Sequence, residues 1–90
     1  MERFERRDRI DICKDILIES ITLSIEKGAT KSYIMKAAGL SFPQTNSYLK
    51  LLIDRKLLKK ENGIYIITQK ALKFLESYHN IELLLKEEKS

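Results

Sequence analysis

The side chains of this sequence that could do chemistry are basic, amide and hydroxyl groups concentrated between residues 31 and 62. Lysine presents a positive charge to a phosphate, whereas glutamine and asparagine can form paired hydrogen bonds with an adenine edge. Residue types of this kind are typical of a surface that binds a polyanion, and the alternative is a lysine-rich surface that is only solvated. The candidate residues are Lys31, Ser32, Lys36, Gln44, Asn46, Ser47, Lys50, Lys59, Lys60 and Asn62.

The net charge of +4 is distributed unevenly along the 90 residues. Residues 27–73 carry ten basic side chains against Asp54 and Glu61, which gives +8, whereas residues 1–26 and residues 74–90 each carry −2. A basic middle between two acidic ends favours a polyanion as the partner of the middle segment. On charge alone, a solvated surface explains the distribution equally well.

The sequence lacks the residues that catalysis or metal binding would need. Cys13 is the single cysteine and His79 the single histidine, so the chain can form no internal disulfide and no zinc site built on cysteine pairs. Cys13 is expected to be an inert core thiol and His79 a surface or interface residue. No glycine-rich phosphate loop is present, nor a nucleophile with a base to serve it. The sequence predicts a binding protein, not an enzyme, with no cofactor and no metal.

The length and composition predict one small, mostly helical domain. One proline and three glycines leave few helix breakers. No apolar run approaches the ~20 residues of a membrane span, and the charged start from Met1 to Arg7 is unlike a signal peptide. We therefore expect a cytoplasmic protein with no membrane partner and no small-molecule ligand.

Apolar spacing predicts three helices in the first two thirds of the chain. The first runs from about residue 7 to residue 27 and ends at Gly28. Thr30 caps a second helix that closes at Gly39, and Ser41 caps a third. The residues expected on the apolar faces are Ile10, Cys13, Leu17, Ser20, Ile21, Ser24, Ile34, Ala37, Ala38, Thr45, Leu49 and Leu52, and Lys56 lies on the same side of the third helix as the last three.

A hairpin follows the third helix. The pair Asn62-Gly63 lies between two apolar runs, and such a pair suits a two-residue turn because both residues must take positive φ. A turn of this length places Lys60 opposite Tyr65. The sequence predicts two strands here.

The last helix is capped by Thr68 and runs to about Lys86. At 1.5 Å per residue it is about 27 Å long, which is as long as the rest of so small a domain is wide. Ala71 begins an apolar stripe that steps by 3, 4, 3 and 4 residues to Leu85, as in a coiled coil. The alternative is that the stripe only covers the core of its own domain. The residues predicted to form a dimer interface are Phe74, Tyr78, Ile81, Leu84 and Leu85.

The order of these elements is that of a winged helix-turn-helix. In that fold the third helix enters the DNA major groove, and the hairpin, called the wing, lies beside the phosphate backbone. Residues 37–58 are similar to common bacterial and archaeal winged-helix domains, although Lys56 stands where many have glycine. We expect a mainly α fold with a small β-hairpin. Residues 1–68 would form the winged helix-turn-helix DNA-binding domain, with residues 1–6 frayed, and residues 69–90 a dimerisation helix.

Four segments carry a more specific resemblance: Ala29–Met35, Gly39–Ser41, Tyr48–Asp54 and Tyr65–Thr68. Through them the stretch from Ile10 to Leu85 resembles the archaeal ten-kilodalton winged-helix DNA-binding proteins. The resemblance implies a small basic protein that is associated with the nucleoid and binds double-stranded DNA. It also implies a homodimer in which the long C-terminal helix pairs antiparallel with that of a second copy.

The resemblance also gives the candidate residues their roles. Those before residue 39 are expected at phosphates, those between 44 and 50 at base edges, and those after 58 on the wing. The implied role is transcription regulation or chromatin-type architecture. The alternative is a winged helix that binds another protein in a larger assembly. The charge of residues 27–73 favours DNA, whereas Ile64 and Ile66, if exposed, would favour a protein partner.

Overall fold

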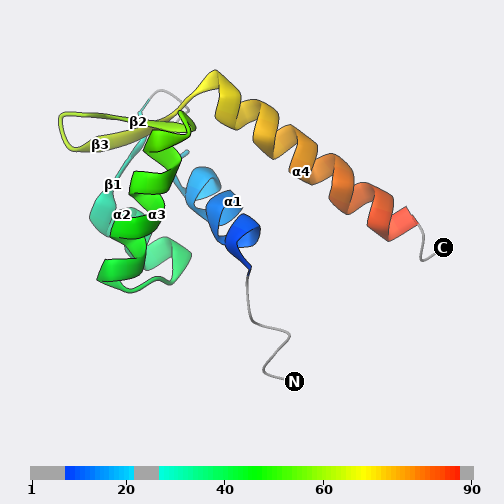
Figure 1. Cartoon of the computed structure of the whole chain (residues 1–90), viewed down its shortest axis with the longest axis horizontal. Coiled ribbons are helices and arrows are strands. Elements are labelled where there is room, and N and C mark those ends of the chain that lie inside the picture. The colour runs from blue at the N-terminus through cyan, green and yellow to red at the C-terminus, as the bar shows by residue number, and fades with distance from the viewer. Residues whose placement is uncertain (1–7, 22–26, 88–90) are drawn as a thin grey trace.

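The computed structural model describes residues 8–21 and 27–87. The predicted fraying of residues 1–6 and the predicted helical stretch over residues 22–26 lie outside the described residues. Figure 1 shows the arrangement of the helices and strands. In chain order they are α1 (Arg9–Glu19), β1 (Ala29–Thr30), α2 (Lys31–Ala38), α3 (Phe42–Asp54), β2 (Leu58–Glu61), β3 (Ile64–Ile67) and α4 (Gln69–Glu87).

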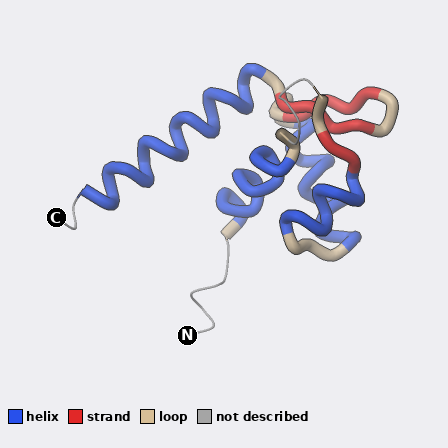
Figure 2. The backbone as a smooth tube through the Cα atoms, turned by 180° about the vertical axis from the view of Figure 1, so that it is seen from behind, coloured by secondary structure: helices blue, strands red, loops and turns tan. Residues whose placement is uncertain are grey.

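Three helices and a small sheet form the body of the molecule. Helices α1, α2 and α3 lie together beside the sheet, and α4 starts at the sheet and extends away from the other helices (Figure 1). Figure 2 shows the same separation from behind, with the strands at one end and the tip of α4 at the other. The predicted fold class, mainly α with a small hairpin, is confirmed.

The hairpin forms as predicted and gains a third strand. Strands β2 and β3 are antiparallel with Lys60 opposite Tyr65, and Asn62 and Gly63 take φ values of +52° and +78°. Strand β1 pairs with the other edge of β3, so the strand order is β1-β3-β2. The sequence did not predict β1, because two residues are too few to show an alternating pattern.

Gly28 has a different role from the one predicted. Instead of ending the first helix, it lies at the entry to β1 with a φ of +69°. A Cβ atom there would lie 2.4 Å from the carbonyl oxygen of Tyr65 and 2.8 Å from side-chain atoms of Ile64 and Ile66. Positive φ and close backbone approach both require glycine, so Gly28 allows β1 to join the sheet.

The first helix ends at Glu19, well before the predicted end at residue 27. The Ser20 hydroxyl is fully buried and donates a 2.8 Å hydrogen bond to the carbonyl oxygen of Ile16. The Ile21 N–H then bonds the carbonyl of Ile18, three residues back. A serine that bonds its own preceding turn competes with the helix ladder, and the tighter last turn closes the helix.

The core fills the space between the three helices and the sheet. Two positions predicted on the apolar faces are wrong: Ala37 is exposed, and Ile10 is 57% exposed. Helix α1 turns Ile16 and Leu17 fully inward, whereas Ile10, on the same side of the helix two turns before Leu17, borders an open hollow beside Leu52 and Phe74. The buried hydrophobic residues are Ile12, Ile16, Leu17, Ala29, Ile34, Ala38, Leu40, Leu49, Leu52, Leu58, Tyr65, Ile67 and Ala71.

Helices α2 and α3 end in the same way, with one residue in the left-handed conformation. After α2 this residue is Gly39, with a φ of +69°. After α3 it is Lys56, with a φ of +65°, and the N–H of Leu57 reaches back 2.8 Å to the carbonyl of Leu52. This hydrogen bond defines a Schellman motif, which normally has glycine at the left-handed position. Lys56 stands where many winged-helix domains have glycine, and its side chain therefore strains the backbone at this position.

We predict that Lys56→Gly stabilises the protein. The left-handed conformation costs a residue with a Cβ roughly 1–2 kcal/mol, and the greater freedom of glycine in the unfolded chain offsets part of that gain. A net increase of about 0.5–1 kcal/mol in the free energy of unfolding is expected from urea denaturation. Lys56→Ala, which removes the same charge but keeps the Cβ, is expected to show no such gain. A glycine variant less stable than the alanine variant would contradict the account.

Candidate nucleic-acid interface

The first turn of α3 is held in a capping box. The Gln44 N–H donates to the Ser41 hydroxyl at 3.2 Å, and the Ser41 N–H donates to the Gln44 side-chain oxygen at 2.9 Å. The Thr45 hydroxyl is buried and donates to the Ser41 carbonyl at 2.8 Å. Pro43 follows in the first turn, where its missing N–H is not needed. The sequence assigned Gln44 to a base edge, yet its oxygen is already bonded at the start of the helix.

Lys31 and Asn46 come together from two helices. The Lys31 ammonium, at the start of α2, donates a 2.7 Å hydrogen bond to the Asn46 side-chain oxygen on α3. The same ammonium lies 5.2 Å from the centre of the Phe42 ring, which is 57% exposed. The sequence analysis did not select Phe42 as a candidate residue. Its position directly after the capping serine was the signal that could have indicated it. These three residues tie α2 to α3 at the surface.

The other candidates on these helices face outward without a side-chain partner in the described part of the chain. They are all exposed, and they lie on the two helices that flank the tight turn. Their hydroxyl and ammonium groups are therefore accessible to an anion. These residues are Ser32, Lys36, Ser47 and Lys50.

The wing, which follows the end of α3, carries the last three candidate residues. Lys59, Lys60 and Asn62 are exposed as predicted. The Lys59 ammonium lies 3.7 Å from the Glu61 carboxylate, and the Lys60 ammonium lies 5.5 Å from the centre of the Tyr65 ring. An exposed ion pair and an exposed cation–π contact are both weak, so both lysines can turn toward a phosphate.

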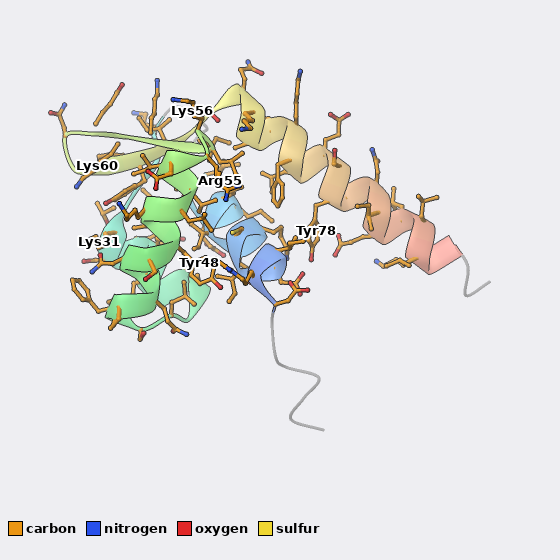
Figure 3. The ribbon with its side chains drawn as sticks, in the orientation of Figure 1. Lys31, Tyr48, Arg55, Lys56, Lys60 and Tyr78 are labelled. Atoms are coloured by element: carbon orange, nitrogen blue, oxygen red, sulfur yellow. The ribbon has the colours of Figure 1, made fainter. Side chains whose placement is uncertain are left out.

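The predicted residues on α2 and on the wing lie on the same side of the body. Figure 3 shows Lys31 and Lys60 on the side of the body away from the tip of α4, with α3 beside them and its last turn next to the wing. The helix-turn-helix and the hairpin thus bring most of the candidate residues to one surface, which we call the α3–wing face.

A second basic group lies away from that face. Arg55 and Lys56 follow the end of α3, and Lys70 and Lys73 begin α4. The Lys70 ammonium donates a 2.8 Å hydrogen bond to the carbonyl oxygen of Arg55. Sequence reasoning counted these charges within the +8 of the middle segment but did not separate them from the α3–wing face.

Helix α4 is fastened to α1 by Tyr78. Its hydroxyl donates a hydrogen bond to the Asp11 carboxylate, and the Lys14 ammonium lies 5.3 Å from the centre of its ring. The hydrogen bond to the Asp11 carboxylate raises the pKa of Tyr78 to about 12. Tyr78 was predicted to lie in a dimer interface, and within this chain it already contacts α1.

Beyond Tyr78 the apolar stripe of α4 is not covered by the residues that the structure describes. Ile81, Leu84 and Leu85 are 58%, 61% and 60% exposed, whereas Ala71 is fully buried and Phe74 is half-buried. The stripe therefore serves its own core in its first half only. We call the three exposed residues the distal face of α4.

Other chemistry finds no support in the part of the chain that the structure describes. Its Cys, His, Asp and Glu residues form no group of three or more that could hold a metal ion. Cys13 is half-buried, and burial raises the pKa of its thiol above the ordinary value. His79 is exposed. No described helix is long and apolar enough to cross a membrane.

A tight turn into a capped helix, followed by a basic hairpin, defines a winged helix-turn-helix protein. The pattern of the winged helix-turn-helix family matches residues 6–86, and this chain belongs to that family. No curated protein matches the chain.

Among solved structures, the chain is similar to Sso10a-2, a DNA-binding protein from Sulfolobus solfataricus. The two superpose with a TM-score of 0.68 and 27% sequence identity, over 92% of this chain and 90% of that chain. The resemblance to the archaeal ten-kilodalton winged-helix proteins that the sequence indicated is thereby confirmed.

We predict that Tyr78→Phe lowers the free energy of unfolding by about 1 kcal/mol at pH 7, because it removes one hydrogen bond and keeps the ring. A raised pKa means that the folded state favours the protonated phenol. The contribution is fully present below pH 10, the ordinary value for tyrosine, and disappears as the pH rises toward 12.

Urea denaturation of both proteins at pH 7 and pH 11 tests this prediction. The difference in stability is expected at pH 7 and is expected to shrink at pH 11. Tyr48→Phe, which removes the same hydroxyl group from a half-buried tyrosine of α3, is the matched control. Equal stability of the parent protein and Tyr78→Phe at pH 7 would contradict the role of the hydrogen bond.

Proposed function

We propose that this protein binds double-stranded DNA as a homodimer, with α3 in the major groove and the wing along the phosphate backbone. The observation that carries the proposal is the α3–wing face. On this face the exposed polar side of α3 lies beside basic side chains of α2 and of the wing (Figure 3). Membership of the winged helix-turn-helix family and the similarity to a DNA-binding protein support it.

The binding energy would come mainly from phosphates. Lys36, Lys50, Lys59 and Lys60 are exposed on this face, and a lysine needs only to come within reach of a phosphate to contribute. Such a protein binds nucleic acid and needs no catalytic group, cofactor or metal. Its place would be on the nucleoid in the cytoplasm.

Of the two roles left open by the sequence, architecture is the better supported. Paired recognition of adenine requires the amide oxygen as well as the amide nitrogen of glutamine or asparagine. The Gln44 oxygen is bonded to the Ser41 N–H, and the Asn46 oxygen is bonded to Lys31. A base would have to share each of these oxygens with its present donor or displace that donor, so we propose a DNA-packaging role with weak sequence preference rather than a specific regulator.

The homodimer rests on the distal face of α4. A large apolar side chain left in water forgoes roughly 1.5–3 kcal/mol relative to full burial, and three such residues are more than half exposed. Pairing with a second copy would cover them. A twofold axis would also present two α3 helices to the same duplex.

The dependence of DNA binding on salt tests the proposed interface. If a dimer neutralises about 6–8 phosphates, log K falls against log salt with a slope of about −5 to −7. Lys59→Ala with Lys60→Ala is expected to weaken binding to all duplexes alike. The slope should become shallower by about 1 for each phosphate that the variant no longer neutralises. Binding that stays constant from low to moderate salt would contradict the proposal.

Two further variants complete this experiment. Lys73→Ala with Lys86→Ala removes the same charge from α4 and should leave the slope unchanged, at concentrations where sedimentation shows the same oligomeric state. Asn46→Ala is expected to leave the small preference among duplexes nearly unchanged. A large loss of preference in Asn46→Ala would favour a specific regulator over an architectural protein.

The dimer is tested by sedimentation. Ile81→Lys with Leu85→Lys places two charges on the distal face and is expected to give monomers with lower DNA affinity. His79→Lys with Leu83→Lys adds two lysines on the opposite side of α4, where both residues are exposed, and is expected to remain dimeric. A parent protein that sediments as a monomer at tens of micromolar would show that the dimer proposal is wrong.

A further inference from the structure

An exposed aromatic ring lies at the start of α3. Phe42 is the first residue of this helix and is 57% exposed. The other large apolar residues that are exposed in the described part of the chain lie on α1, α2 and α4. A single exposed apolar side chain is common on protein surfaces, so the role of Phe42 depends on what surrounds it.

Polar groups of the proposed DNA-contacting surface surround this ring. The Lys31 ammonium lies 5.2 Å from the ring centre and donates its 2.7 Å hydrogen bond to Asn46. Asn46 follows Phe42 by four residues, so the two lie on the same side of α3. Figure 3 places Lys31 beside α3, on the side of the body away from the tip of α4. The ring is therefore part of the α3–wing face.

The ring is held in position before any partner binds. The capping box joins Ser41 to Gln44, the residues that flank Phe42 and Pro43, and fixes the backbone of this turn. The cation–π contact with Lys31 then favours one orientation of the ring. A side chain that is ordered in advance loses less conformational entropy on binding.

The helix-turn-helix geometry brings this end of α3 to the bases. In such proteins the recognition helix lies in the major groove with its N-terminal residues against base edges. The base pairs present hydrogen-bond donors and acceptors in that groove, and thymine alone adds an apolar group, the C5-methyl. An apolar ring at the start of α3 thus has one complementary group on the DNA.

We propose that the Phe42 ring packs against thymine methyl groups in the major groove and gives the protein a modest preference for A·T-rich duplexes. This inference rests on the proposed function and adds which part of a base the protein contacts. Contact between a phenylalanine ring and the thymine methyl is a recognised means of reading that base.

The proposed contact leaves the polar groups of α3 undisturbed. The side-chain oxygens of Gln44 and Asn46 already accept hydrogen bonds within the chain. A ring contacts a methyl group without forming a hydrogen bond, so Phe42 does not compete with those bonds. It can meet a base while the capping box and the bond from Lys31 to Asn46 remain intact.

The expected preference is small because one methyl group is a small contact. Burial of one such group strengthens binding by about fourfold, which is at the low end of the discrimination that a paired hydrogen bond to a base provides. A preference of this size biases a DNA-packaging protein toward A·T-rich DNA and does not confine it to one site.

Two duplexes that differ only in thymine methyl groups test the proposal. One contains alternating adenine and thymine. In the other, deoxyuridine replaces every thymine, which removes the methyl group and keeps every phosphate and every hydrogen-bonding group. The parent protein is expected to bind the thymine duplex about fourfold more tightly, and Phe42→Ala is expected to lose this difference. Comparison of the two proteins cancels the effect of the methyl group on the shape of the duplex.

Two variants and one further measurement serve as controls. Phe42→Leu keeps an apolar side chain and is expected to retain part of the preference. Tyr33→Ala removes an exposed aromatic ring from α2 and is expected to retain all of it. Because Phe42→Ala removes no charge, its affinity is expected to fall with salt at the same slope as that of the parent protein.

The outcomes separate this inference from the proposed function. A parent protein that binds both duplexes with equal affinity would overturn the role of Phe42 and leave DNA binding intact. A preference for thymine that survives in Phe42→Ala would overturn it as well. A parent protein that binds neither duplex at low salt would overturn both the inference and the proposed function.

Discussion

The structure depends on the burial of one face of α3 in a very small core. Thr45, Leu49 and Leu52 are at most 2% exposed, and they fix how α3 rotates about its axis. Because the same helix has only one such face, its polar residues must point to solvent on the other side. The position of the tight turn and that of the proposed DNA-contacting surface both follow from this packing.

The surface built on α3 is stiffened by its own polar groups. The capping box between Ser41 and Gln44 and the contact between Lys31 and Asn46 hold the start of the helix in place. Groups that are already paired are poorly placed to select bases. Charges at the edges of the face remain accessible, so electrostatic attraction to phosphates accounts for the proposed function better than base readout does.

Much of the fold could be predicted from the sequence, because strong local signals agree with the packing. Thr30, Gly39, Ser41 and the Asn62-Gly63 pair mark element ends that the structure confirms. Two features lacked such a signal. Strand β1 depends on the close approach of Gly28 to Tyr65, and the end of α1 depends on a buried serine bond. The candidate residues could be identified from their types, but only the structure shows Gln44 and Asn46 bonded within the chain.

The central claim is that DNA meets the α3–wing face. It is tested most directly by recording amide spectra of the protein while a short duplex is added. The account predicts the largest shifts at the start of α2, along the exposed side of α3 and at the turn of the wing, with smaller shifts at Lys70 and Lys73. Shifts confined to the group around Arg55 and Lys70, or no shifts at all, would contradict it.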